Sequence, residues 1–178
     1  VIARAVRGPV RIEPFIVGRR GLSRTFRAFA IKFRSIRRNH RVLHGVNPFS
    51  GFQVDDETVR FECEQGLRNL RLRAVHAFVA HGTDPKRYVR YLDNVRADAF
   101  VLLSETLRLG GVDVPNDPRE RIAPIAETFR VDATILGDLV ALGRKPRVLS
   151  ASECVDFHAR LFRLLEGAIA WMEERWPT

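Results

Sequence analysis

The sequence predicts a mainly α-helical protein: an antiparallel bundle of about five helices, preceded by a short basic segment that contains β-structure. Apolar residues recur at helical spacing from Asp55 onward, and capping residues and glycines mark the helix ends. Residues 1–54 are strongly basic, whereas residues 55–178 carry nearly balanced charge. Residues 10–17, VRIEPFIV, are apolar and β-branched, as strands are. The chain is therefore expected to divide into a basic N-terminal segment and a helical bundle.

The composition limits the classes of protein to which the chain can belong. With 178 residues, 46% of them apolar, it is long enough to bury one medium-sized core. No run of about 18 apolar residues occurs, so we expect no membrane span, and Arg4, Arg7 and Arg11 interrupt any secretory signal. Cys63 and Cys154 are too few for a disulfide framework or a zinc site. We therefore expect two buried thiols and a cytoplasmic protein.

Two long helices open the predicted bundle. Asp55 or Asp56 caps the first, whose apolar residues recur every three or four positions up to Gly82, the expected left-handed residue at its end. Asp84 followed by Pro85 starts the second, because the first position of a helix needs no backbone hydrogen-bond donor. The glycines at 110 and 111 end this second helix.

Two short helices and a third long one follow. Asp117, which precedes a proline, repeats the start signal for a short helix in which Pro124 is expected to bend the helix or remove a backbone bond. Asp132 caps another short helix that runs through Leu142. The sequence Ser150-x-x-Glu153 is a capping box and opens the last helix. The tight loops between these helices favour an antiparallel arrangement.

The basic charge is concentrated near the N-terminus. Residues 1–50 contain 11 arginines and one lysine against one acid, Glu13, whereas the other 128 residues contain 18 basic and 20 acidic residues. Within this segment, residues 29–36 fit two periods: apolar and polar residues alternate as in a strand, while phenylalanines 26, 29 and 33 also share a helical face. The charge asymmetry indicates two segments of different character.

Two stretches resemble bacterial nucleotidyltransferase-like proteins: FAIKFRSIRRNHRVLHGVNPF at residues 29–49 and VRFECEQGLRNLRLR at residues 59–73. In those proteins a Phe-Pro-x-Glu-Phe-Leu-Asp segment leads into a His-x-Val-Leu stretch, and a helix with Cys-Glu opens a helical bundle. The resemblance covers roughly residues 26–176. It implies a strand at residues 29–36, and it implies that residues 55–178 correspond to the helical accessory domain that shapes the substrate cleft and the dimer contact.

The same resemblance implies that this chain does not transfer nucleotides by itself. The polymerase-β-like fold uses a Gly-Ser turn and an Asp-x-Asp pair, and its carboxylates hold two Mg²⁺ ions. This sequence contains neither motif, and Lys32, Arg34 and Ser35 stand where similar proteins carry acids, with Val46 in place of a glutamate. Guanidinium groups do not bind metal cations. We therefore expect no metal site, no cofactor and no catalytic residue of this kind.

A HEPN-like ribonuclease is a second interpretation. Its minimal motif is an arginine and a histidine separated by four to six residues, and Arg71 and His76 have this spacing on the first long helix. Arg34 with His40, and arginine 37 or 38 with His44, have it too. In RNA cleavage, histidine would act as the general acid and base, and arginine would stabilise the negative charge on the phosphate. In a sequence with this many arginines the same spacing also arises by chance. The alternative to a catalytic pair is a solvated Arg71 with a partly buried His76.

Nucleic-acid binding is a third interpretation. The arginines of the basic segment are interleaved with Phe15, Phe26, Phe29 and Phe33, so the segment offers cations for phosphates and rings for bases. Alternatively, the phenylalanines belong to the core and the arginines face water or the acids of the bundle. The composition also suits a transit peptide or a membrane-surface helix, although the strand-like residues 10–17 argue against one long amphipathic helix.

The interpretation that the residues favour is a non-catalytic binding module. Its expected ligand is anionic, a nucleotide, an RNA or an acidic partner, with no membrane, and a homodimer through helix faces is a further expectation. Arg71 and His76 are kept as the alternative catalytic pair. The predicted anion contacts are Arg34, Arg37, Arg38 and Arg41.

Overall fold

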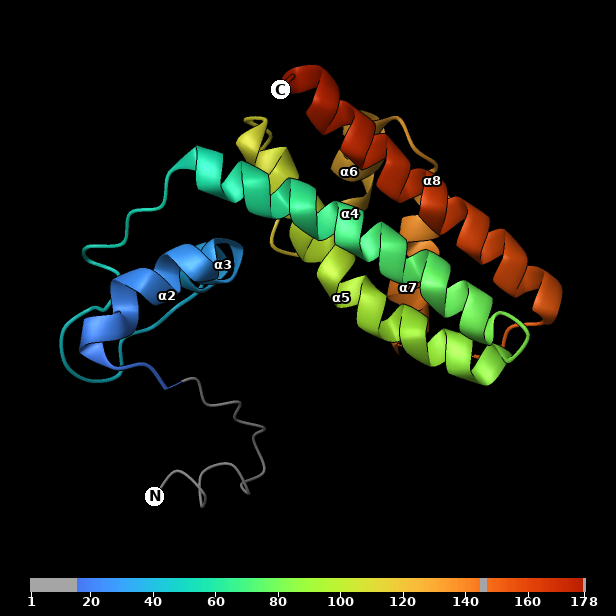
Figure 1. The fold of residues 1–178 in the computed structure, drawn as a ribbon, viewed down its shortest axis with the longest axis horizontal. Coiled ribbons are helices and arrows are strands. Elements are labelled where there is room, and N and C mark those ends of the chain that lie inside the picture. Colours follow the sequence, from blue (N-terminus) through green and yellow to red (C-terminus); the bar gives the residue numbers. More distant parts are fainter. Residues whose placement is uncertain (1–15, 145–146, 178) are drawn as a thin grey trace, which may run out of the picture. The chain divides into compact units, whose positions relative to one another are not determined.

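The computed structural model describes residues 16–144 and 147–177 (Figure 1). The chain forms two compact units, Val1–Val54 and Asp55–Thr178, and each is described by itself. Every regular element among the described residues is a helix. The predicted mainly helical fold is therefore confirmed, whereas the β-structure predicted before the bundle is not found in the described residues.

The described part of the N-terminal unit contains a short 3-10 helix and two short α-helices. The 3-10 helix η1 covers Arg19–Gly21, α2 covers Leu22–Ala28 and α3 covers Ala30–Arg38. The backbone breaks at Phe29, which ends α2 and precedes α3. An irregular segment with turns follows α3 and returns to α2, where its Phe49 and Phe52 pack on Phe26 (Figure 1).

The predicted strand at residues 29–36 is wrong, because these residues lie almost entirely in α3. Helical spacing lets Ala30 and Phe33 be buried together, with 0% and 4% of their surface exposed. A strand would need a neighbouring strand for its backbone hydrogen bonds, and residues 16–54 form none. The other predicted strand, at residues 10–17, lies mainly outside the described residues, and Ile16 and Val17 belong to no helix.

Among the described residues of the N-terminal unit, four phenylalanines form a core cluster. Phe26 of α2 and Phe33 of α3 meet Phe49 and Phe52, which lie on the segment after α3. The centroid of the Phe26 ring lies 4.9 Å from that of Phe33, 5.5 Å from that of Phe49 and 4.8 Å from that of Phe52. Aromatic pairs in such geometry add about 0.5–1.5 kcal/mol beyond burial. The unit therefore has a small aromatic core of its own.

The described residues of the second unit form a bundle of five helices, as predicted. Three of them are long, and Figure 1 shows α4, α5 and α8 running side by side, with α4 packed on both of the others. The short helix α7 packs against α5, α6 and α8. The helices are α4 (Asp56–His81), α5 (Pro85–Leu109), α6 (Ile122–Phe129), α7 (Ala133–Arg144) and α8 (Ala151–Arg175).

Three of the predicted helix caps are confirmed. The Asp55 carboxylate accepts the backbone N–H of Thr58 at 2.7 Å, and Asp84 caps α5 with Pro85 in its first turn. Ser150 and Glu153 form the full capping box of α8. The backbone N–H of Ser150 is the main cause that lowers the pKa of Glu153 to about 2. Side-chain caps therefore set the starts of all three long helices.

Two helix boundaries differ from the prediction. Gly82 has φ −60° and is right-handed, because its N–H closes a normal hydrogen bond to the Phe78 carbonyl. Asp117 accepts the Arg119 N–H in a turn, and α6 begins only at Ile122. Pro124 therefore stands in the first turn of α6, where a missing N–H costs nothing and no bend results.

Both cysteines are buried, as the sequence predicted. Cys63 of α4 and Cys154 of α8 are fully enclosed in the bundle core, and burial raises the pKa of the Cys154 thiol. No helix among the described residues combines the length and the apolar character needed to cross a membrane.

Candidate anion-binding surface

The described part of the N-terminal unit is free of acidic side chains. Residues 16–54 contain eight arginines and one lysine and no Asp or Glu. In the bundle, by contrast, most arginines that line the helices pair with carboxylates, such as Arg68 with Glu64 and Glu173, or Arg160 with Asp138. The N-terminal unit therefore carries a concentration of positive charge that no carboxylate within residues 16–54 offsets.

The four arginines predicted as anion contacts lie on α3 and just beyond it. Arg34, Arg37 and Arg38 are three and four residues apart on α3, so they share one side of this helix. Arg41 follows the end of the helix at Asn39 and is exposed. The predicted cluster is thus a helical row of three arginines with a fourth on the adjoining loop.

Arg37 is held in place by an aromatic contact. Its guanidinium carbon lies 5.6 Å from the centroid of the Phe52 ring, a cation–π distance. Arg37 and Arg38 also stand in the last turn of α3, where the carbonyl end of the helix favours positive charge. The helix end therefore stabilises cations that face solvent.

A loop carries Arg41 outward from the end of α3. The His40 ring contacts the Arg37 carbonyl through Nδ1 at 2.8 Å and the Asn47 amide oxygen through Nε2 at 3.2 Å. The same amide oxygen accepts the backbone N–H of Phe49 at 2.9 Å. These bonds tie both ends of the loop to the aromatic core and leave Leu43 with 89% of its surface exposed.

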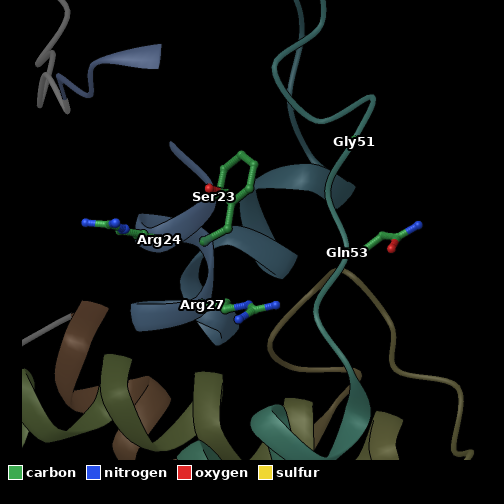
Figure 2. Close-up of a pocket in the computed structure, with 6 residues that line it drawn as sticks. Ser23, Arg24, Arg27, Gly51 and Gln53 are labelled. Carbon is green, nitrogen blue, oxygen red and sulfur yellow. The ribbon is translucent and has the colours of Figure 1, made fainter. Parts of the chain in front are cut away.

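A hollow of about 380 Å³ lies between α2 and the segment that follows α3 (Figure 2). In Figure 2 the Arg24 and Arg27 side chains leave α2 in opposite directions, with Arg27 directed toward the Gly51–Gln53 side. Neither arginine forms an ion pair or a hydrogen bond with a described residue. The lining residues are Ser23, Arg24, Phe26, Arg27, Gly51 and Gln53.

Arg24 and Arg27 were not among the predicted contacts. The signal that identifies them is their helical spacing with the buried Phe26, which places arginines on α2 beside its core face. Because the sequence prediction treated residues 29–36 as a strand, it gave no reason for α2 and the segment at residues 51–53 to lie next to each other. The hollow was therefore not foreseen.

The phenylalanines have a structural role for the most part. Phe26 and Phe33 are buried in the aromatic core, so their ring faces are not available for stacking on bases. Phe29 is exposed over 52% of its surface, and Phe15 lies outside the described residues. The alternative in which the phenylalanines form the core and the arginines face outward is therefore correct for Phe26 and Phe33.

The alternative catalytic pair is not assembled into a site. The Arg71 guanidinium pairs with the carboxylate of Glu166 on α8, whereas His76 is exposed. A separation of five residues turns their side chains about 140° apart around α4. The structure therefore places Arg71 in a contact between helices, and His76 on a different side of α4.

One histidine of the bundle has a packed environment. The His158 ring stacks on Phe78 at a centroid distance of 4.2 Å, and its Nδ1 lies 3.2 Å from the Tyr88 hydroxyl. Burial lowers the pKa of His158 and raises the pKa of Tyr88. Burial also raises the pKa of the neighbouring Tyr91 to about 12. These shifts favour the neutral forms, as expected of a structural cluster.

The described residues contain no group of three or more His, Cys, Asp or Glu side chains arranged to hold a metal ion. Comparisons with known protein families, with curated proteins and with solved structures found no match. The resemblance to nucleotidyltransferase-like proteins therefore stays a prediction from sequence.

Proposed function

We propose that this chain is a non-catalytic binding module whose N-terminal unit binds nucleic acid, chiefly through the phosphates. One observation carries the proposal: residues 16–54 contain nine arginines and lysines and no carboxylate, and their phenylalanines form an aromatic core. Each phosphate that an arginine neutralises releases a condensed counterion, which drives association at physiological salt. The planar guanidinium group also matches phosphate geometry with two parallel hydrogen bonds.

The distribution of the cations favours a polymer over a small anion. Arg24 and Arg27 lie on α2, Arg37 lies on α3 and Arg41 lies on the following loop, so the charges are spread over several elements of the described part of the unit. A single nucleotide contacts only a few of them, whereas a strand with repeating phosphates contacts many. Since Phe26 and Phe33 are buried, binding is expected to depend little on base sequence.

The resemblance to an accessory domain gives the bundle a compatible role. In this proposal α4–α8 form the scaffold, and a second copy pairs through a helix face. The support for pairing is an exposed apolar stripe along α4, formed by Phe61, Leu72 and Val79, which recur at 11 and 7 residues and so lie on one side of the helix.

Fluorescence anisotropy with a labelled oligonucleotide tests the nucleic-acid proposal. The affinity is expected to fall steeply between about 50 and 200 mM salt. Replacing the four arginines that the sequence predicted as contacts should lower the salt-dependence slope by about 3, at roughly 0.7–0.9 per lost phosphate contact. This variant is R34Q/R37Q/R38Q/R41Q.

A matched variant controls for net charge. It removes four exposed arginines of the bundle, for which the structure shows no ion pair with a described residue, and should leave the affinity nearly unchanged. Absence of binding at low salt, or an equal loss in both variants, would contradict the proposal. The control variant is R90Q/R119Q/R144Q/R163Q.

A further inference from the structure

We propose that the hollow of Figure 2 holds one unstacked nucleotide, so that the N-terminal unit prefers single-stranded to double-stranded nucleic acid. This inference rests on the proposed function and specifies the form of its ligand. The hollow has a volume of about 380 Å³. Pockets for small organic ligands span roughly 300–1,000 Å³, so the hollow has room for one nucleotide.

The polar side chains around the hollow are available to a ligand. Ser23, Arg24, Arg27 and Gln53 line it, and none of them makes a hydrogen bond or ion pair with a residue that the structure describes. All four side chains are exposed, so their polar groups face water and can exchange it for a ligand that enters the hollow.

The directions of the two arginines indicate how a strand would lie. In Figure 2 the Arg24 and Arg27 side chains leave α2 in opposite directions, so their guanidinium groups do not converge on one phosphate. They are instead placed for two phosphates of the same strand, one on each side of the nucleotide between them. A chain passing over α2 is bound in this way at several successive phosphates.

The other lining residues suit a base. Phe26 lines the hollow with the 6% of its surface that stays exposed, and Gly51 borders open space, since a Cβ placed on it would meet no atom within 4 Å. Gln53 also lines the hollow, and an amide carries both a donor and an acceptor that a base edge can use. The site thus combines cations at its sides with a neutral, partly apolar interior.

A concave site of this kind distinguishes single strands from duplexes. In a duplex the bases are paired and stacked inside the helix, and the outer surface presents mainly phosphates and sugars. A duplex therefore meets the arginines without filling the hollow. A single strand can rotate one base out of its stack and place it there.

Three probes of equal length test this inference with the full chain: a labelled oligo-dT of about 12 nucleotides, the corresponding duplex and an abasic strand with the same phosphates. Wild type is expected to bind oligo-dT about two- to tenfold more tightly than the abasic strand, the effect of one or two hydrogen bonds and apolar contacts. Because a duplex of equal length carries about twice as many phosphates, its affinity is compared at equal phosphate concentration, where it should be no higher than that of the abasic strand.

Two substitutions locate the effect. Gly51→Leu fills the hollow at a position whose backbone accepts a side chain, and Gln53→Ala removes the side-chain amide. Both should reduce the preference for oligo-dT while leaving the salt dependence of duplex binding unchanged. Gly18→Leu, in the same unit but outside the hollow, and Gln65→Ala, on α4, are the matched controls and should keep the preference.

The outcomes separate this inference from the proposed function. Salt-dependent binding with equal affinity for the three probes, or a preference that Gly51→Leu and Gln53→Ala both retain, overturns the inference and leaves the phosphate-binding proposal standing. If no probe binds at low salt, the proposed function itself fails. Because the comparison of probes uses wild-type protein, the test does not depend on whether a variant folds.

Discussion

The two units of this protein use arginine in opposite ways. In the bundle, acidic and basic residues are nearly equal in number, and arginines such as Arg73 and Arg160 form ion pairs with Asp98 and Asp138. In residues 16–54 no carboxylate occurs, and Arg24 and Arg27 line a hollow without partners among the described residues. Arginine therefore stabilises the scaffold of the bundle, whereas Arg24 and Arg27 are available to an external anion.

The cores of the two units differ as well. The bundle buries aliphatic residues along the full length of three long helices, for example Leu67, Leu92 and Leu161. The N-terminal unit relies on four phenylalanines between two short helices and a returning segment. Large aromatic rings bury much surface per residue, which lets a small and self-repelling unit remain folded. The difference predicts that the N-terminal unit is the less stable one.

Removing the central ring of the aromatic core should give the largest change in stability, and it tests whether the two units have separate cores. Phe26→Ala should destabilise the N-terminal unit by about 3–5 kcal/mol, because it deletes contacts with three other rings. Amide hydrogen exchange should then show α2 and α3 losing protection while α4 and α5 keep theirs.

Phe29→Ala is the matched control for that experiment. Phe29 belongs to the same unit but is half exposed, so its loss should cost much less. If the bundle helices lose protection together with α2 in Phe26→Ala, the two units do not have separate cores.

The bundle was predictable because its signals are local. Asp55, Asp84 and Ser150 cap helices that a regular apolar spacing had already indicated, and the structure has each helix in place. The two wrong predictions about helix boundaries concern glycine and proline, which each occur in two different backbone positions. Gly82 can end a helix in either hand, and Pro124 is harmless in a first turn although it would disrupt a helix interior.

The N-terminal unit was predictable only in part. The alternation of residues 29–36 fits a strand as well as a helix, and the choice depends on the contact of Phe33 with Phe49 and Phe52, which lie 16 and 19 residues further along the chain. The same returning segment forms one side of the hollow, so the hollow could not be inferred either. The excess of arginine, in contrast, is a property of composition and was visible at once.

A smaller effect is expected from pH, and it should be confined to the bundle. Burial lowers the pKa of His158 below its ordinary value of about 6.5, so the folded bundle favours the neutral ring. The stability that this neutral ring contributes is complete above pH 6.5 and is lost as the pH falls below it. The loss should be at most about 1 kcal/mol, because the ring is only half buried.

Hydrogen exchange of α8 between pH 8 and pH 5 measures this effect, after correction for the intrinsic exchange rate. His158→Gln should remove the dependence while keeping an acceptor for the Tyr88 hydroxyl. His76→Gln, which changes an exposed histidine of α4, should retain the full dependence. A dependence that persists in His158→Gln would show that another group is responsible.

The smallest expected effect gives the most direct contrast between the two units. Replacing one arginine should lower the stability of the bundle but should not lower that of the N-terminal unit. Arg73→Gln breaks an exposed pair with Asp98 at 3.0 Å and should cost the bundle about 0.2–1 kcal/mol. Arg27→Gln removes a cation from residues 16–54, which contain no acid, and should leave the stability of the N-terminal unit unchanged or raise it by up to about 0.5 kcal/mol, because repulsion between like charges falls. Unit-specific hydrogen exchange at low salt measures both, and both changes should shrink at about 1 M salt, where charges are screened. A loss of stability in Arg27→Gln as large as that in Arg73→Gln would mean that Arg27 has a structural role, and that the arginines of the N-terminal unit are not held for a ligand.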